Sequence, residues 1–275
     1  MKSQADKAAA FAALHEAGCF VIPNPWDVGS ARILAGQGFK ALTTTSAGFA
    51  RSVGVPDYNV TRDQVMAHIR DLSVATDLPL AADLENGFGP DPEDCAETIR
   101  LGAAAGLVGG SIEDATGNAA DPIFALEAAT DRIRAAAEAA RALPFKFMLV
   151  ARAENYLYGR GDLRDTISRL QAYQDAGADV LYAPGLATAE DIRTVCAEVD
   201  RPVNVLCGFG GVTNSVAALA ELGVRRVSLG SWLHSLAMTA LVDAGKAMQA
   251  GDFGFTGSVV AGSELNRLLK AGSAD

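Results

Sequence analysis

The chain has 275 residues, of which 49% are hydrophobic and 20% are charged. This length fits one large α/β domain or two small ones, and the apolar content can bury a core, which argues against a disordered chain or a disulfide scaffold. The formal charge of −10 argues against nucleic acid or an anionic membrane as a partner, because both require a concentrated positive face.

The N-terminal segment carries charged side chains and lacks an apolar core of secretory length, so we expect no signal peptide. The longest uncharged stretch, residues 202–220, contains asparagines and glycines and does not resemble a membrane helix. The four cysteines show no CxxC spacing and no paired framework, which favours reduced thiols. A cytoplasmic protein is the simplest interpretation.

A repeated alternation organises the chain: an Ala-rich helical stretch, a glycine that closes the helix, and a short β-rich run that ends in polar residues. Eight apolar runs are candidate strands: Cys19–Ile22, Ala41–Thr44, Leu80–Asp83, Leu107–Ile112, Phe147–Arg152, Val180–Tyr182, Val203–Leu206 and Arg226–Leu229. Such runs between helices predict a parallel sheet covered on both sides. We expect a single (β/α)₈ TIM-barrel domain over residues 1–275, with a doubly wound sheet as the alternative.

Residues 232–275 are predicted to form a helical extension of the barrel. Trp232–Met248 reads as an apolar helix, followed by a glycine-rich bend at Gly251–Gly257 and a short final helix. A helix this apolar must be covered, either by its own barrel or by a neighbouring subunit.

Carboxylates gather after the third and fourth predicted strands, at the end of the barrel where active sites lie. Asp83 and Glu85 are two residues apart in an extended run, so their side chains are expected to point to the same side. Two like charges there repel unless a cation or a shared proton lies between them, and Glu113 approaches from the neighbouring strand. Three hard oxygen donors select Mg²⁺ or Mn²⁺ over Zn²⁺. The alternative is that Asp83 caps the next helix and Glu85 is solvated.

Cationic and amide groups lie near these carboxylates in the predicted barrel. Arg152 ends the fifth strand, where its guanidinium suits a carboxylate or phosphate ligand, or forms a salt bridge to Glu154 or Glu113. Ser46, Ala47 and Gly48 form either an anion-binding nest of amides or a plain turn. The glycine-rich segment 208–211 is interpreted as a tight turn rather than a phosphate-binding loop.

Two other catalytic classes lack suitable residues. Lys40 and Lys146 precede their strands and therefore lie at the wrong end of the barrel, which disfavours a Schiff-base aldolase. His15 and His68 are predicted on helices and are expected at the surface, so neither is expected to serve in a His-based triad or a zinc site.

A family resemblance is carried by seven segments that occur in order along the chain: TTSAG, GVPD, DLENGFG, SIED, DRIRAA, ARAEN and PVNVL. In this combination the chain resembles the isocitrate lyase and phosphoenolpyruvate mutase superfamily. The resemblance implies a (β/α)₈ barrel with a Mg²⁺ ion that is chelated by an α-keto acid or its enolate. By position, Asp83 matches the main metal ligand, and Glu85 and Glu113 match residues that hold the ion directly or through water.

The resemblance also assigns substrate contacts and an assembly. The segment from Thr44 through Ser46, Ala47 and Gly48 matches the one that binds the substrate carboxylate, and Asp57 matches a loop acid that acts with Glu113 and Arg152 in catalysis. Arg152 matches an arginine that faces the substrate oxygens, and Asn204 a polar substrate contact. The family implies a homo-oligomer, typically a tetramer, in which the helix after the barrel is swapped between subunits.

Three departures from the family pattern bear on the reaction. Lyases carry a Lys-Lys/Arg-Cys-Gly-His loop whose cysteine is the general acid, whereas residues 115–122 here read ATGNAADP. The acid near the sixth strand is replaced by Pro184 and Gly185, and Glu85 replaces a more usual aspartate.

The sequence therefore predicts a Mg²⁺-dependent enzyme, a C–C lyase, decarboxylase or hydrolase, that acts on a small anionic 2-oxo acid of the pyruvate, oxaloacetate or 2-oxoglutarate type. P–C bond chemistry on phosphonopyruvate is one alternative. A 2-oxo acid binding protein without catalysis is another, suggested by the missing loop acid.

Overall fold

The computed structural model describes residues 2–208 and 215–274, and its centre is one curved sheet of eight parallel strands. The strands are β1 (Phe20–Val21), β2 (Leu42–Thr43), β3 (Leu80–Asp83), β4 (Gly109–Glu113), β5 (Met148–Arg152), β6 (Val180–Tyr182), β7 (Val203–Leu206) and β8 (Arg226–Ser228). Strands β2 to β8 pair in chain order, and β8 also pairs with β1. Between β2 and the end of β1, the Thr43 N–H donates to the Pro23 carbonyl at 3.1 Å. The predicted (β/α)₈ barrel is confirmed, and the doubly wound alternative is wrong.

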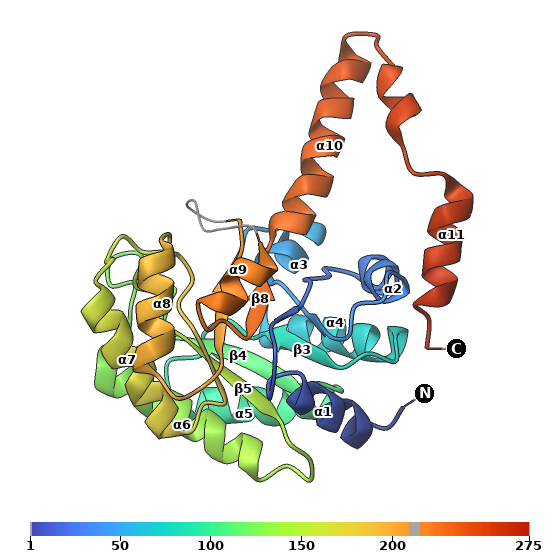
Figure 1. Cartoon of the computed structure of the whole chain (residues 1–275). Helices are drawn as coiled ribbons and strands as arrows, with labels where there is room; N and C mark the ends of the chain where they lie inside the picture. The colour runs from blue at the N-terminus through green and yellow to red at the C-terminus, as the bar shows by residue number, and fades with distance from the viewer. Residues whose placement is uncertain (1, 209–214, 275) are drawn as a thin grey trace.

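Helices follow the strands and surround the sheet (Figure 1). They are α2 (Val28–Gly36), α3 (Ser46–Ser52), α4 (Arg62–Ala75), α5 (Pro92–Ala104), α6 (Leu126–Arg141), α7 (Leu163–Ala176), α8 (Ala189–Glu198) and α9 (Val216–Glu221). Hydroxyl and carboxylate side chains start many of them; Asp27 and Thr61, for example, form reciprocal capping boxes at α2 and α4. The main core lies between these helices and the outer face of the sheet, where Leu149, Ile112 and Leu181 are completely buried.

A further helix, α1 (Gln4–Ala13), precedes the barrel and packs against the apolar layer inside it. Phe11 of α1 is completely buried among Val108, Met148 and Val180. Gly109 provides the room, since a Cβ there would lie 2.8 Å from the Phe11 ring.

The histidine that follows α1 is not at the surface. His15 is 5% exposed, and its ring makes edge contacts with Phe11 and Phe20 at centroid distances of 4.9 Å. The expectation of a surface residue was wrong because the His15 ring packs inward between Phe11 and Phe20, although residues 16–18 after it are exposed. Burial, aided by the nearby Arg226 charge, lowers the pKa of His15 to about 4. His68 is half-buried and stacks on Phe49.

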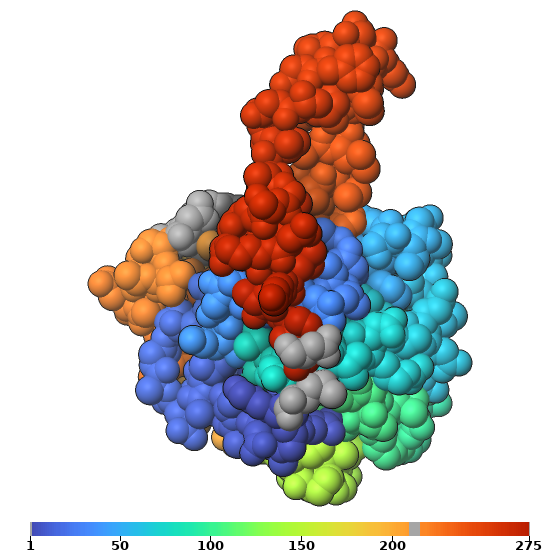
Figure 2. Space-filling view, turned by 90° about the vertical axis from the view of Figure 1, so that its right-hand side faces the viewer, coloured from blue at the N-terminus to red at the C-terminus, as the bar shows by residue number. Residues whose placement is uncertain are grey.

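The C-terminal extension stands away from the barrel as an arm (Figures 1 and 2). It consists of α10 (Trp232–Gln249), a 3₁₀ turn (Gly254–Ser258) and α11 (Gly262–Ala271), and α11 returns to pack on α2. The side chains of Leu236 and Leu241 on α10 are 69% and 61% exposed. The alternative in which α10 packs on its own barrel is therefore wrong for most of this helix. Packing of α10 against a second subunit stays a prediction.

Across residues 2–208 and 215–274, no helix combines the length and apolar character needed to cross a membrane. None of the four cysteines, all of which lie in the described residues, forms a disulfide.

Candidate active site

Arg152 lies at the centre of a carboxylate cluster at the C-terminal ends of β3, β4 and β5. Its side chain is 14% exposed, and Nε donates to Glu154 Oε1 at 2.8 Å. Nη1 donates to Asp83 Oδ1 at 3.0 Å, and Nη2 lies 3.1 Å from Glu113 Oε2. The parallel register pairs Arg152 directly with Glu113, which explains why this guanidinium meets that carboxylate. Both predicted salt bridges, to Glu154 and to Glu113, are thus present together.

The cluster carries more negative than positive charge. Burial raises the pKa of Glu113 well above its usual range, with the charges of Glu154 and Asp83 adding to the effect and Arg152 opposing it. The pKa of Glu154 is raised for the same first reason, burial. Burial alone would lower the pKa of Arg152, but the surrounding carboxylates raise it well above that of a free guanidinium. The site therefore keeps one fixed cation among several carboxylates that an additional cation would stabilise.

Asp83 and Glu85 are close together, but not for the reason that the sequence suggested. β3 ends at Asp83, and Glu85 has φ +49°, so it is left-handed rather than extended and the same-side argument does not hold. The Glu85 N–H instead donates to Asp83 Oδ1 at 3.2 Å. The Glu85 side chain is buried and its Oε1 has no hydrogen-bond partner among the described residues. Burial, with the charges of Asp83 and Asp57, raises the pKa of Glu85 to about 8.

The donor set fits a hard divalent cation in kind. Asp83, Glu85 and Glu113 offer only carboxylate oxygens, and the unpartnered Glu85 Oε1 is a buried acceptor that needs a donor or a cation. As the side chains lie, however, no three acidic, histidine or cysteine side chains of the described residues form a group that could hold a metal. The guanidinium of Arg152 is the cation that now joins Asp83 and Glu113. The predicted metal set stays a prediction.

The segment expected to bind the substrate carboxylate forms the start of α3. Thr45 caps this helix by accepting from the Gly48 N–H at 3.3 Å, and the Ser46 N–H donates to Asp83 Oδ2 at 3.3 Å. Thr44 is buried, and its Oγ1 accepts from the Asp83 N–H at 3.1 Å. A Cβ at Gly48 would lie 2.5 Å from Thr45 Cγ2, so only glycine fits there. The segment, which includes Ala47, therefore holds Asp83 in place.

The predicted loop acid faces the same group of residues. Burial and the charge of Asp83 raise the pKa of Asp57, while a hydrogen bond with the Ser46 side chain acts in the opposite direction. Asp57 and Ser46 also line one cavity with Asp83 and Arg152. The structure thus brings Asp57, Asp83, Glu113 and Arg152 to one site.

Two tyrosines that the sequence analysis did not single out complete the cluster. The Tyr58 hydroxyl donates to Glu113 Oε1, and the Tyr158 hydroxyl lies 3.4 Å from that of Tyr58. Desolvation and the Glu113 charge raise the pKa of Tyr58, so this phenol stays protonated. The sequence feature that could have indicated Tyr58 is its position directly after Asp57, the last residue of the GVPD segment.

The cavity that contains Asp83 and Arg152 has a volume of about 200 Å³ and extends into the barrel. Asn204 lines it, is 2% exposed, and donates through Nδ2 to Ser228 Oγ at 2.9 Å. Arg226, which belongs to none of the motifs selected from the sequence, lines the same cavity.

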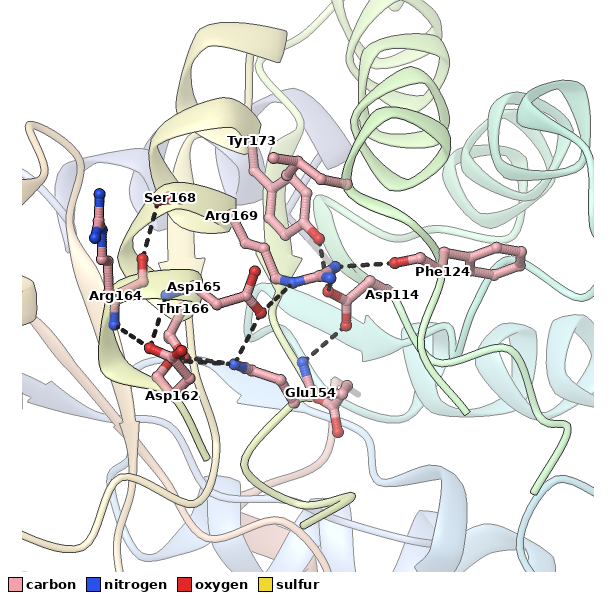
Figure 3. A network of polar contacts seen from close by, with 12 residues as sticks. Asp114, Phe124, Glu154, Asp162, Arg164, Asp165, Thr166, Ser168, Arg169 and Tyr173 are labelled. Atoms are coloured by element: carbon pink, nitrogen blue, oxygen red, sulfur yellow. Dashed lines mark hydrogen bonds and ion pairs between the residues drawn. The ribbon is translucent and has the colours of Figure 1, made fainter. Parts of the chain in front are cut away.

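A second buried network, made of hydrogen bonds and ion pairs around Asp114, lies next to the site (Figure 3). Asp114 follows Glu113, and its Oδ1 accepts from the Glu154 N–H at 2.8 Å. Its Oδ2 accepts from Arg169 Nη1 at 3.1 Å and from the Tyr173 hydroxyl at 2.6 Å. Asp114 therefore connects α7 to the loop that positions Glu154.

The remaining sequence predictions concern two loops. The loop that lacks the lyase cysteine forms a turn in which the Ala120 N–H donates to Asn118 Oδ1 at 3.0 Å. Of the glycine-rich segment predicted as a tight turn, Gly208 is described and has φ +87°, but residues 209–214 lie outside the described residues.

Comparisons with known proteins agree with this architecture. The family model of phosphoenolpyruvate phosphomutase matches residues 11–249. The solved structure of a candidate lyase/mutase from Burkholderia cenocepacia J2315 is 57% identical, with a TM-score of 0.93 over 96% of this chain and 95% of that one. An uncharacterized protein of Mycobacterium tuberculosis is 33% identical over 87% of this chain and 88% of its own. An oxaloacetate decarboxylase of Bradyrhizobium diazoefficiens is 29% identical over 85% of this chain and 82% of its own. The chain therefore belongs to the phosphoenolpyruvate phosphomutase family, within the isocitrate lyase and phosphoenolpyruvate mutase superfamily of enzymes.

Proposed function

We propose that this protein is a Mg²⁺-dependent enzyme that binds a small 2-oxo acid, of the pyruvate, oxaloacetate or 2-oxoglutarate type, and cleaves or forms a C–C bond. The observation that carries the proposal is the Arg152 guanidinium, fixed by Asp83, Glu113 and Glu154 at a cavity of about 200 Å³. A fixed guanidinium orients carboxylate and carbonyl oxygens, and the surrounding carboxylates suit a hard cation. The relative named as an oxaloacetate decarboxylase supports this substrate class.

Asp83, with Glu85 and Glu113, would hold the ion directly or through water. When bound, Mg²⁺ supplies a Lewis acid that withdraws electron density from the 2-oxo group of the substrate. Glu85 is the residue most ready for this role, because its buried Oε1 has no hydrogen-bond partner within the described part of the chain.

The remaining residues bind and orient the substrate. The Arg152 guanidinium and the amides of Ser46, Ala47 and Gly48 would hold the carboxylate and the oxygen on which negative charge develops. The substrate would then replace Asp83 Oδ2 as the acceptor of the Ser46 N–H, and Thr45 Oγ1 as the acceptor of the Gly48 N–H. The Tyr58 hydroxyl holds a proton at Glu113 Oε1, beside the same cluster. With no cysteine in the loop of residues 115–122, this phenol is the proton donor that we assign to the carbon left after bond cleavage.

The test is a product assay with a panel of pyruvate, oxaloacetate, 2-oxoglutarate and phosphonopyruvate, each with Mg²⁺ and with EDTA. We expect Mg²⁺-dependent turnover of a 2-oxo acid, loss of turnover in Asp83→Ala, and full turnover in Asp131→Ala, which removes an exposed carboxylate on α6. Turnover of phosphonopyruvate alone, followed by ³¹P NMR, would assign P–C chemistry instead. Binding without any product would identify a 2-oxo acid binding protein.

A further inference from the structure

The cavity below Arg152 contains a second arginine, Arg226, near its floor. Arg226 and Ser228 are two residues apart on β8 and face the same side, and the parallel register pairs Arg226 with Asn204 of β7. All three line the cavity. Arg226 begins its strand, whereas Asp83 and Arg152 end theirs, so Arg226 lies deeper in the barrel.

The guanidinium of Arg226 is buried, and no residue of the described ranges 2–208 and 215–274 provides a counter-ion. The residue is 4% exposed, it forms no ion pair with the described residues, and its Nε and Nη1 have no hydrogen-bond partner among them. Burial lowers the pKa of Arg226 to about 10. A buried charge without compensation is unfavourable, so this group requires an anion.

Other buried arginines in the same chain do have partners. Arg132, 2% exposed, donates to the carbonyls of Asn86 and Pro90. Arg169, 9% exposed, pairs with Asp114 and Asp165. Arg226 differs from both, because the cavity-lining residues nearest to it on β7 and β8, Asn204 and Ser228, are neutral.

The neutral neighbours of Arg226 form hydrogen bonds with groups other than its guanidinium. Ser228 Oγ accepts from Asn204 Nδ2 at 2.9 Å and also forms a hydrogen bond with the Tyr182 side chain. Asn204 Oδ1 is buried and has no partner among the described residues. The floor therefore combines one unpaired cation with polar groups that face the same space.

We infer that the barrel floor is a second anion subsite, in which the Arg226 guanidinium binds the distal carboxylate of a 2-oxo dicarboxylate. This inference rests on the proposed function and narrows it, because it selects a dicarboxylate over pyruvate. The cavity of about 200 Å³ is below the roughly 300–1,000 Å³ of common ligand pockets, which limits the ligand to a short chain.

The test compares two acids with the same number of carbons, oxaloacetate and 2-oxobutyrate, which differ by a carboxylate in place of a methyl group. Their dissociation constants are measured by calorimetry with Mg²⁺ present. We expect the wild type to bind oxaloacetate at least tenfold more tightly than 2-oxobutyrate. Arg226→Met should remove this preference by weakening oxaloacetate alone, and Arg226→Lys should keep part of it. Arg225→Met, which changes the adjacent exposed arginine, should keep all of it.

Four outcomes decide the inference. Equal affinities of the wild type for the two acids would overturn the subsite and leave the proposed function standing. An unchanged preference in Arg226→Met, shown by thermal denaturation to be folded, would do the same. Failure of both acids to bind would overturn the proposed function and the subsite together. In the last outcome, inorganic phosphate stabilises the wild type but not Arg226→Met, and the wild type shows no preference between the two acids. This result would assign the floor to a free anion and would contradict binding of a distal carboxylate there.

Discussion

Tyr58 has a backbone conformation that non-glycine residues seldom adopt, with φ +60°. This conformation accompanies the contact between its hydroxyl and Glu113. A residue held in a strained conformation at a site often serves the function of that site.

The first prediction concerns this hydroxyl. Tyr58→Phe removes only the proton donor, so we expect kcat to fall by about 10²-fold or more while the affinity for substrate and the melting temperature stay near those of the wild type. Steady-state kinetics and thermal denaturation measure both. Tyr158→Phe, whose hydroxyl lies 3.4 Å from Tyr58 and outside the carboxylate cluster, should have a smaller effect. Full activity in Tyr58→Phe would contradict the assignment.

The second prediction concerns Asp114, which the sequence placed beside Glu113 without a separate role. Asp114→Ala leaves the buried Arg169 and Tyr173 with fewer partners, so we expect the free energy of unfolding to fall by about 3 kcal/mol or more. Chemical denaturation measures this, and Asp121→Ala, an exposed acid, should change it by less than about 0.5 kcal/mol. Equal stability of the two variants would show that the network in Figure 3 contributes little.

At the scale of elements, α1 closes one end of the barrel and carries a pH-dependent contribution to stability. The pKa of His15 is about 4 in the folded chain and near 6.5 when unfolded, because the charged form is unfavourable next to Phe11, Phe20 and Arg226. Above pH 6.5 both states are neutral. As the pH falls from 6.5 to 4, only the unfolded state gains the proton, so stability is lost in this window by about 3 kcal/mol.

The third prediction follows from this linkage. His15→Gln should remove this contribution, so that the difference in the free energy of unfolding between wild type and variant changes by about 3 kcal/mol between pH 6.5 and 4, measured by denaturant titrations at several pH values. The slope that remains in the variant should combine His68, whose pKa is also lowered to about 4, first by burial, with the opposite contribution of Glu85, whose pKa is raised to about 8. An unchanged slope in His15→Gln would contradict the burial of this histidine.

The strands were predictable because each is a short apolar run with polar residues after it; the bounds of β3, β6 and β7 agree with the sequence. The conformation of Glu85 was not predictable, because the alternation of side chains along a strand assumes an extended backbone, whereas Glu85 is left-handed. Arg225 and Arg226 show a second limit of prediction from the sequence. Adjacent strand residues face opposite sides, but nothing local indicates which of two arginines points into the barrel.

At the scale of the molecule, the arm formed by α10 and α11 leaves an apolar surface in water. Leu236, Leu241 and Val242 on α10 are each more than half exposed, and monomeric proteins seldom expose contiguous apolar surface of this kind. The predicted helix swap between subunits would bury it.

The fourth prediction tests the arm. We expect the wild type to be a homo-oligomer in light scattering coupled to gel filtration, and Leu241→Glu to lower its mass towards that of one chain. Lys246→Glu, which changes an exposed charge on the same helix, should leave the mass unchanged. A monomeric wild type would contradict the predicted assembly.

We propose that Asp83, Glu85 and Glu113 hold a cation through which a 2-oxo acid binds beside Arg152. The most direct test is a calorimetric titration of oxaloacetate into the wild type with Mg²⁺ and with EDTA, repeated for Asp83→Ala. We expect oxaloacetate to bind the wild type with Mg²⁺ only, and Asp83→Ala to lose at least tenfold in affinity. Equal affinity with Mg²⁺ and with EDTA, or undiminished binding by Asp83→Ala, would contradict it.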